Sequence, residues 1–127
     1  MEFILKTNFN TTAKKIYETW LSSEGHTKMT GGFANISDKI GGKFTAWDGY
    51  IEGINIDLNL NKRIVQTWRT SQFDEDEKDS QIEVLLNEVN GKTELTITHT
   101  NLSDSGEHYK KGWEDQYFEP MRNYFSK

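Results

Sequence analysis

The chain has 127 residues, 34% apolar and 13% aromatic, which is enough for one domain over residues 1–127 with one hydrophobic core. Its net charge is −5 and its basic residues form no long run, which argues against a nucleic-acid partner because phosphate contacts need a basic surface. There is no cysteine, no signal-peptide pattern and no apolar run long enough to span a membrane, so we expect a cytoplasmic protein without disulfides or membrane insertion.

The N-terminal third predicts one strand followed by two short helices. Residues 3–9 alternate between apolar and polar side chains, which is typical of a half-buried strand. A helix capped by Thr11-Thr12 is expected to run to about residue 21, and a second helix to lie near residues 23–29. Residues 33–36 are then expected to form a short strand.

The middle of the chain predicts an antiparallel meander. The expected strands are residues 43–47, 50–60, 63–70, 81–89 and 93–100. Asp48-Gly49 and Asn90-Gly91 are strong hairpin signals, because both central positions of such turns need positive φ. The acidic segment 74–79 is expected to be a solvated loop that charge repulsion keeps extended.

The last part of the chain predicts a long helix with one aromatic face. Five large apolar side chains recur every four residues, namely Tyr109, Trp113, Tyr117, Met121 and Phe125. This spacing places them on one side of a helix, which Ser103 or Ser105 is expected to cap and Pro120 to kink. Because such a helix needs a sheet to lie on, we expect an α+β fold with the element order β-α-α-β(six)-α.

Several short motifs resemble one known family by their order and spacing. They are Gly41-Gly42-Lys43-Phe44, Asp48-Gly49, Gly53, Lys62-Arg63-Ile64-Val65, Trp68-Arg69, Asn90-Gly91-Lys92-Thr93-Glu94-Leu95, Gly112-Trp113, Tyr117-Phe118-Glu119 and Phe125. Over nearly the whole chain they resemble the C-terminal domain of the activator of the ninety-kilodalton heat-shock chaperone's ATPase. The chain has no room for the separate N-terminal domain of the eukaryotic activator.

This resemblance implies a helix-grip fold, in which a curved antiparallel sheet wraps around the long C-terminal helix. It also implies membership of a wider START-like superfamily of lipid-transfer, hormone-binding and polyketide-cyclase-like proteins. Many members of that superfamily hold a small apolar ligand between sheet and helix, so this gap is the first place to expect a site.

The concave face of the sheet and the aromatic face of the helix are expected to enclose a hydrophobic cavity. Ala46 and Gly53 are small enough to leave room for a ligand, and Asn55, Gln66 and His99 are the candidate inward polar groups. The candidate ligand-binding residues are Trp20, Met29, Phe44, Ile51, Gly53, Gln66, Trp68, Ile97, His99, Trp113, Tyr117 and Met121. The alternative is that the large aromatic side chains fill this space as ordinary core.

Few residues are candidates for catalysis or metal binding. The sequence has no nucleophile-elbow motif, no phosphate-binding loop and no His-Glu-x-x-His. His99 is the one candidate general acid or base, and the alternative is a hydrogen-bonded wall histidine. A zinc site from His99, Glu107 and His108 is conceivable but has no supporting motif, so we expect no catalytic residue, no metal and no cofactor.

Three functions remain as hypotheses. The resemblance implies a non-catalytic, co-chaperone-like module of the stress response whose partner is a heat-shock chaperone. Its steering surfaces would be Lys14, Lys15, Lys110, Lys111 and the acidic segment 74–79. The alternative is a binder of a small apolar or aromatic ligand in the cavity. A cyclase-like or hydrolase-like enzyme is the third, and it would depend on His99.

Overall fold

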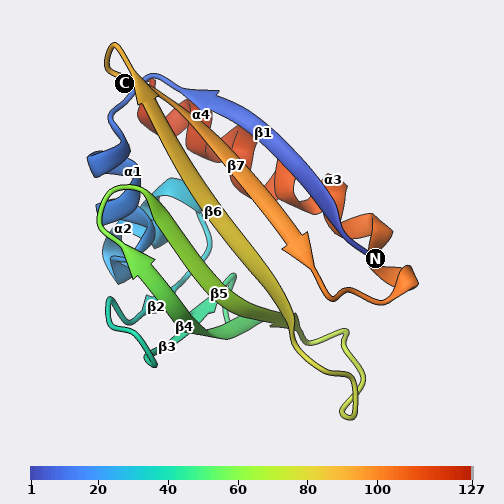
Figure 1. The fold of residues 1–127 in the computed structure, drawn as a ribbon. Helices are drawn as coiled ribbons and strands as arrows, with labels where there is room; N and C mark the ends of the chain where they lie inside the picture. The colour runs from blue at the N-terminus through green and yellow to red at the C-terminus, as the bar shows by residue number, and fades with distance from the viewer. Residues whose placement is uncertain (127) are drawn as a thin grey trace.

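One antiparallel sheet of seven strands forms the body of the computed structural model, which describes residues 1–126. The strands are β1 (Phe3–Phe9), β2 (Asn35–Ile36), β3 (Lys43–Ala46), β4 (Ile51–Asn59), β5 (Arg63–Thr70), β6 (Ser80–Val89) and β7 (Lys92–Thr100). They lie in the order β1-β7-β6-β5-β4-β3-β2. The helices α1 (Ala13–Trp20) and α2 (Ser23–Thr30) follow β1, and the C-terminal helix runs along the sheet behind β1 and β7 (Figure 1). The predicted element order is therefore confirmed.

Side-chain capping starts both N-terminal helices. The Thr12 hydroxyl accepts a hydrogen bond from the Lys15 backbone N–H at 3.1 Å, as the sequence predicted for α1. The Ser22 hydroxyl accepts from the Gly25 N–H at 3.1 Å and starts α2 in the same way. Gly31 ends α2 with φ of +88°, a left-handed conformation that glycine adopts without strain.

The two predicted hairpins differ in shape. Asn90-Gly91 joins β6 to β7 with φ of 55° and 77°, which confirms the expected two-residue turn. The turn before β4 is wider, because Trp47, Asp48 and Gly49 all have positive φ, at 52°, 58° and 86°. Strand β3 therefore ends at Ala46 and not at Trp47, and the left-handed backbone carries the Trp47 side chain out of the strand's alternation.

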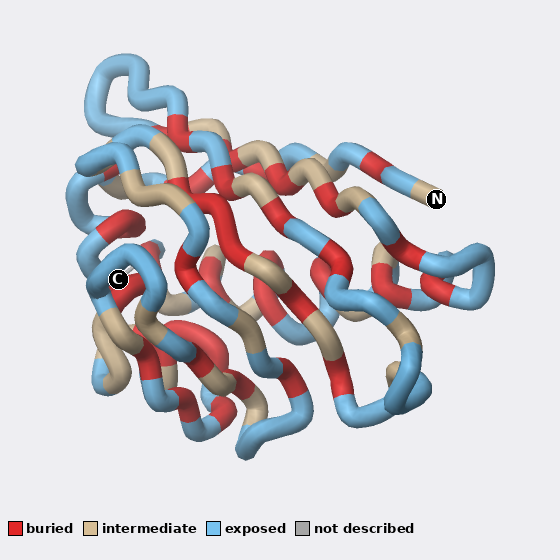
Figure 2. The backbone as a smooth tube through the Cα atoms, turned by 60° about the horizontal axis from the view of Figure 1, so that its bottom comes forward, coloured by how far each residue is buried: buried red, intermediate tan, exposed pale blue. Residues whose placement is uncertain are grey.

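Inward-facing side chains of the sheet and the helices build the hydrophobic core. Buried and exposed residues alternate along most strands (Figure 2), as expected for a sheet that has one face covered. The buried apolar residues of the strands from β3 to β7 include Phe44, Ala46, Ile51, Ile64, Trp68, Ile82, Val84, Leu95 and Ile97. The fold is thus the helix-grip arrangement that the sequence predicted.

Gly53 has a packing role that differs from the one expected. A Cβ atom at this position would lie 1.9 Å from the Thr67 carbonyl oxygen and 2.6 Å from Cε1 of Phe44. The glycine therefore lets β4 and β5 approach each other under the Phe44 ring, and it leaves no space for a ligand. The expectation that Gly53 makes room in a cavity is wrong.

The C-terminal helix is continuous but changes its winding. It consists of the 3₁₀ segment η1 (Asp104–His108), α3 (Tyr109–Trp113), the π-helical segment η2 (Glu114–Phe118) and α4 (Glu119–Phe125). Four residues in an α-helix turn about 40° past a full turn, so a stripe repeating every four residues would spiral around a regular helix. The wider π turn takes back part of this drift, and all five residues of the predicted stripe are buried.

Pro120 is the second residue of α4, one position beyond the Glu119 that follows this π-helical segment. A proline cannot donate a backbone hydrogen bond, and its ring collides with the carbonyl four residues earlier in a regular α-helix. The preceding turn instead closes with the Glu119 N–H bonded to the Glu114 carbonyl, five residues back. The turn ahead of Pro120 is therefore widened, and the kink expected at Pro120 stays a prediction.

Two further local predictions are wrong. Ser103 occupies the position before η1, but its side chain makes no capping bond and instead contacts the Ser105 hydroxyl at 2.8 Å. The acidic segment 74–79 is not extended, because Arg69 donates hydrogen bonds to the Asp79 carboxylate and to the carbonyls of Asp74 and Glu77. The positive charge of Arg69 offsets the repulsion among the acidic side chains, which was the only effect considered in predicting an extended loop.

Candidate ligand pocket

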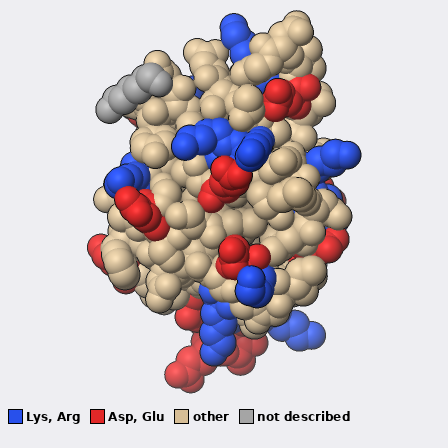
Figure 3. Space-filling view, turned by 90° about the vertical axis from the view of Figure 1, so that its left-hand side faces the viewer, with Lys and Arg blue, Asp and Glu red and all other residues tan. Residues whose placement is uncertain are grey.

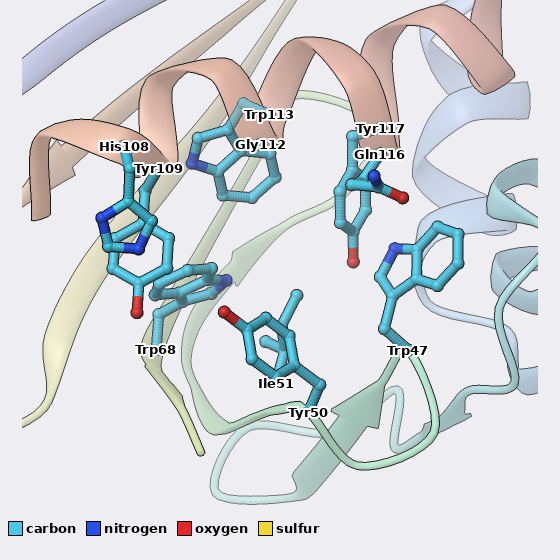
Figure 4. Close-up of a pocket in the computed structure, with 10 residues that line it drawn as sticks. All are labelled: Trp47, Tyr50, Ile51, Trp68, His108, Tyr109, Gly112, Trp113, Gln116 and Tyr117. Atoms are coloured by element: carbon cyan, nitrogen blue, oxygen red, sulfur yellow. The ribbon is translucent and has the colours of Figure 1, made fainter. Parts of the chain in front are cut away.

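A pocket of about 390 Å³ lies between one end of the sheet and the C-terminal helix (Figure 4). It is lined by Trp47, Tyr50, Ile51, Trp68, His108, Tyr109, Gly112, Trp113, Gln116 and Tyr117. None of these ten described lining residues is a Lys, Arg, Asp or Glu. The pocket therefore favours a neutral aromatic or apolar molecule over an ion.

Stacked and edge-on aromatic rings make up the pocket walls. The Trp68 ring meets Tyr109 edge-on at 4.9 Å between centroids and lies 5.8 Å from Trp113. The Trp113 ring is 4.8 Å from Tyr117 along the helix. Such pairs contribute about 0.5–1.5 kcal/mol each beyond the area they bury, so these contacts help to hold the pocket walls in place.

Hydrogen bonds tie the two sides of the pocket mouth together. The Tyr109 hydroxyl on the helix pairs with the Thr70 hydroxyl on β5 at 2.6 Å. The Tyr50 hydroxyl donates to Oε1 of Gln72 at 2.7 Å, and His108 faces the same amide oxygen across the mouth. Burial raises the pKa of Tyr109, so its hydroxyl stays neutral at physiological pH.

His99 lies behind the pocket wall and not in the pocket. The Trp113 indole N–H donates to Nδ1 of His99 at 3.1 Å, and Nε2 lies 2.9 Å from the Ser80 hydroxyl. Because an indole can only donate, Nδ1 is the acceptor and the ring proton sits on Nε2, pointing at Ser80. The Ser80 hydroxyl in turn donates a hydrogen bond to the Trp68 carbonyl oxygen at 2.6 Å. Desolvation lowers the pKa of His99 to about 3, so it is a neutral, fully bonded wall residue.

His26 is buried in a similar arrangement behind Tyr117. Nδ1 of His26 donates to the Trp20 carbonyl at 2.8 Å, and Nε2 accepts from the Tyr117 hydroxyl at 2.7 Å. Burial lowers the pKa of His26 to about 4, and burial raises the pKa of Tyr117. The pair therefore fixes the inner end of the Tyr117 ring with both groups neutral.

The predicted inward polar groups Gln66 and Asn55 also bond to protein. The Trp20 indole N–H donates to Oε1 of Gln66 at 3.3 Å, and Nε2 of Gln66 donates to Oδ1 of Asn55 at 2.9 Å. The Asn55 amide then donates to the carbonyls of Ser37 and Lys39. This network joins α1, β5, β4 and the loop before β3, which gives these polar side chains a structural role.

The structure separates the twelve predicted site residues into two groups. Ile51, Trp68, Trp113 and Tyr117 line the pocket. Gly53 is partly exposed on β4, and seven are buried elsewhere in the molecule: Trp20, Met29, Phe44, Gln66, Ile97, His99 and Met121. The alternative that large side chains fill the space thus applies to the part of the cavity around α1 and α2, while the part near α3 stays open. Contact of any of these residues with a ligand stays a prediction.

Six lining residues were not among the predicted ones. Trp47 and Tyr50 flank the Asp48-Gly49 turn, and His108, Gly112 and Gln116 each precede a member of the aromatic stripe by one position. Tyr109 belongs to the stripe itself. The sequence signals that could have identified them are an aromatic pair beside a turn and the residues flanking a buried stripe.

Within residues 1–126, no three His, Asp or Glu side chains are close enough together to hold a metal ion. The same residues include no helix that is long and apolar enough to cross a membrane.

A curved antiparallel sheet, a long C-terminal helix and an aromatic pocket between them define a helix-grip protein of the START-like kind. The family model described as "Activator of Hsp90 ATPase homolog 1-like protein" matches residues 10–126. The chain therefore belongs to this family, as the sequence motifs indicated.

Known relatives and structures agree with this assignment. The human activator of 90 kDa heat shock protein ATPase homolog 1 is 30% identical over 122 residues, covering 95% of this chain and 36% of the relative. A Dictyostelium discoideum homolog is 27% identical over 125 residues, covering 96% and 32%. The chain thus spans about a third of the length of these relatives. The crystal structure of an HSP90 activator from Plasmodium falciparum has a TM-score of 0.90 at 21% identity, covering 99% of this chain and 96% of that one.

Proposed function

We propose that this protein binds a small, neutral aromatic or apolar ligand in the pocket between its sheet and its C-terminal helix. The observation that carries the proposal is an open space of about 390 Å³ walled by aromatic rings, with no charged side chain among its described lining residues. Small-molecule sites typically enclose about 300–1,000 Å³, with apolar walls and a few polar groups.

The proposal is one of binding without catalysis. A general acid or base must lie within hydrogen-bond reach of the bound molecule. Both ring nitrogens of His26 and of His99 are engaged by protein groups behind the wall. His108 lies at the exposed mouth, where its Nδ1 faces the Ser105 carbonyl at 2.9 Å.

Native mass spectrometry of freshly purified protein tests this proposal. We expect an added mass that is lost on denaturation and that identifies as a neutral aromatic or apolar compound. A Gly112→Leu variant is the matched control, because a Cβ at Gly112 meets no atom within 4 Å and a longer side chain there enters the pocket. Wild-type protein that carries no ligand and takes up none from a panel of aromatic compounds would refute the proposal.

A second function, contact with a heat-shock chaperone, is favoured by the family. The match covers residues 10–126, and the Plasmodium falciparum structure described as an HSP90 activator is covered over 96% of its length. We propose on this basis that the domain is a co-chaperone-like module that contacts a chaperone of the ninety-kilodalton class.

The surface charges indicate which region of the molecule would contact such a partner. Lys14 lies 4.0 Å from Glu18, and Lys110 and Lys111 pair with Glu107 and Asp115 at 2.9 and 2.8 Å. Figure 3 shows basic and acidic side chains mixed over one side of the molecule, with acidic side chains gathered at the lower end. The acidic loop 74–79, which projects there in Figure 1, is therefore the better candidate for steering than Lys14, Lys110 and Lys111.

Isothermal calorimetry with the cognate chaperone, with and without nucleotide, tests the second function. We expect measurable heat at tens of micromolar and weaker binding when Glu75 and Asp76 are both changed to Lys. Glu52→Lys, an exposed charge reversal on β4, is the control that should leave binding unchanged. The absence of heat under both conditions would contradict the co-chaperone role.

A further inference from the structure

Asn90 and Gly91 form the exposed end of the β6–β7 hairpin, and Asn90 is the one asparagine of the chain that a glycine follows. An asparagine side-chain amide can be attacked by the backbone nitrogen of the next residue, and a side chain on that residue hinders the attack. Glycine has no side chain, and a Cβ built on Gly91 would meet no atom within 4 Å. The attacking nitrogen at this turn is therefore free of steric hindrance.

Both reacting groups of this dipeptide are also free of hydrogen bonds. Within residues 1–126, neither the Gly91 backbone N–H nor the Asn90 side-chain amide has a hydrogen-bond partner. Residues 87–92 are all exposed, so this end of the hairpin has few buried contacts and its local opening costs little free energy. Such opening lets the Asn90 side chain turn its carbonyl carbon toward the Gly91 nitrogen.

Two other turn asparagines are protected where Asn90 is not. Asn61 and Asn101 have positive φ as well, at 62° and 61°. The backbone N–H that follows Asn61 donates to the Asn59 carbonyl at 3.0 Å, and the one that follows Asn101 donates to the Met1 carbonyl at 3.2 Å. Their attacking nitrogens are thus engaged, and each belongs to a residue with a long side chain.

We propose that Asn90 is a site of spontaneous deamidation. The deprotonated Gly91 nitrogen attacks Cγ of Asn90 and forms a bond to it, while the bond from Cγ to the side-chain nitrogen breaks and ammonia leaves, carrying the proton that Gly91 has given up. Water then opens the resulting succinimide ring at either carbonyl. The products are aspartate and isoaspartate, and in isoaspartate the backbone runs through Cβ and Cγ and is longer by one methylene group.

A residue pair close to this turn holds the segment that leads into α1. Glu88 on β6 and Thr93 on β7 lie opposite each other in the register of the hairpin. Oε1 of Glu88 accepts a hydrogen bond from the Ala13 N–H at 2.8 Å, and the Thr93 hydroxyl donates to the Thr11 carbonyl at 2.8 Å. Figure 1 shows this end of the hairpin beside the connection from β1 to α1.

A longer backbone at position 90 disturbs this attachment. The turn type and the length of the loop fix the register of a hairpin, so an added methylene group displaces Glu88 relative to Thr93. The bond from the Ala13 N–H to Glu88 is then weakened in the isoaspartate form. The aspartate form keeps the original backbone length and with it the bond. None of these residues lines the aromatic pocket, so the modification is separate from ligand binding there.

Peptide mapping by mass spectrometry, on folded protein incubated at pH 6.5 and at pH 8.5, tests the site. The mass change from amide to acid should accumulate at Asn90 as separate aspartate and isoaspartate peptides, and faster at pH 8.5, because more of the Gly91 nitrogen is deprotonated there. Asn61 and Asn101 in the same sample are internal controls and should keep their amides. An Asn90 that loses its amide no faster than these two residues would overturn the proposal.

Amide hydrogen exchange, measured by NMR, tests the consequence for α1. In the isoaspartate form, separated by chromatography, the Ala13 N–H should exchange faster than in fresh protein. Asn90→Asp is the matched control, because it has the added charge without the added methylene group, and its Ala13 N–H should exchange as in fresh protein. Equal exchange of Ala13 in all three proteins would overturn the inferred effect on α1.

Discussion

The indole N–H of Trp113 donates to Nδ1 of His99 across 3.1 Å, joining the C-terminal helix to β7. Because Trp113 also forms part of the pocket wall, this bond connects the packing of the sheet to the shape of the pocket. It fixes the histidine in one neutral tautomer.

Removing the Ser80 hydroxyl, which is hydrogen-bonded to the other ring nitrogen of His99, should destabilise the protein. Ser80→Ala leaves Nε2 of His99 and the Trp68 carbonyl without their shared partner, so we expect a loss of about 1–3 kcal/mol in the free energy of unfolding. Urea unfolding measures the change. Ser103→Ala is the control, since its exposed hydroxyl contacts only that of Ser105, and it should change stability by less than about 0.5 kcal/mol. Equal effects of the two substitutions would contradict the role of Ser80.

Stability should fall as pH decreases below 6.5. Burial lowers the pKa of His26 to about 4 and of His99 to about 3, so both are neutral in the folded state, while in the unfolded state they protonate near pH 6.5. The unfolded state therefore binds more protons between pH 6.5 and pH 4, and each histidine should cost about 2 kcal/mol of stability at pH 5.

Urea unfolding at pH 7.5 and pH 5.0 checks this dependence. His99→Gln should lower stability at both pH values yet remove about half of the difference between them, because one of the two titrating groups is gone. A variant whose stability falls with pH as steeply as the wild type would show that His99 is not the buried neutral group described above.

Two glycines should respond to alanine with opposite signs. Gly53→Ala places a methyl group against the Thr67 carbonyl and Phe44, so we expect a loss of more than about 3 kcal/mol. Gly112→Ala adds a methyl group to a helix where nothing lies within 4 Å, so we expect a gain of about 0.5–1 kcal/mol. Thermal unfolding of both variants measures this contrast, and a stable Gly53→Ala protein would contradict the close approach of β4 and β5.

Arg69 should hold the acidic loop in its folded form. Arg69→Ala removes the hydrogen bonds to Asp79 and to the carbonyls of Asp74 and Glu77, so the loop should be cut faster by a glutamate-specific protease. Arg63→Ala is the control from the same strand, because Arg63 pairs with Asp57 and Glu83 away from the loop. Equal cleavage rates in the wild type and Arg69→Ala would mean that other contacts order the loop.

The periodicity of the sequence predicted the architecture because helices, strands and tight turns are determined largely by interactions between residues close together in the chain. Alternation of side chains, the turn dipeptide Asn90-Gly91 and the four-residue stripe from Tyr109 to Phe125 each report on the backbone around them. The helix caps at Thr12 and the turn at Gly31 follow from the same short-range hydrogen bonding and φ preferences.

The pocket was predicted less well because its shape depends on contacts between distant segments. Sequence alone placed His99 and Gln66 in the cavity, since it cannot show that Trp113 and Trp20 supply their hydrogen-bond partners. It also left Trp47 on a strand, because it cannot show that the Trp47 ring packs against Gly32, which is distant along the chain.

Nuclear Overhauser contacts between bound fluorene and isoleucine methyl groups test the central claim most directly. Ile51 is the one isoleucine that lines the pocket, whereas Ile64 and Ile97 are fully buried in the core and Ile4 is exposed at 62%. In protein labelled at its isoleucine methyl groups, ligand contacts should appear at Ile51 and be absent at the other three. Contacts at Ile4 with none at Ile51 would place the ligand on the outer surface and contradict a binding site between the sheet and the C-terminal helix.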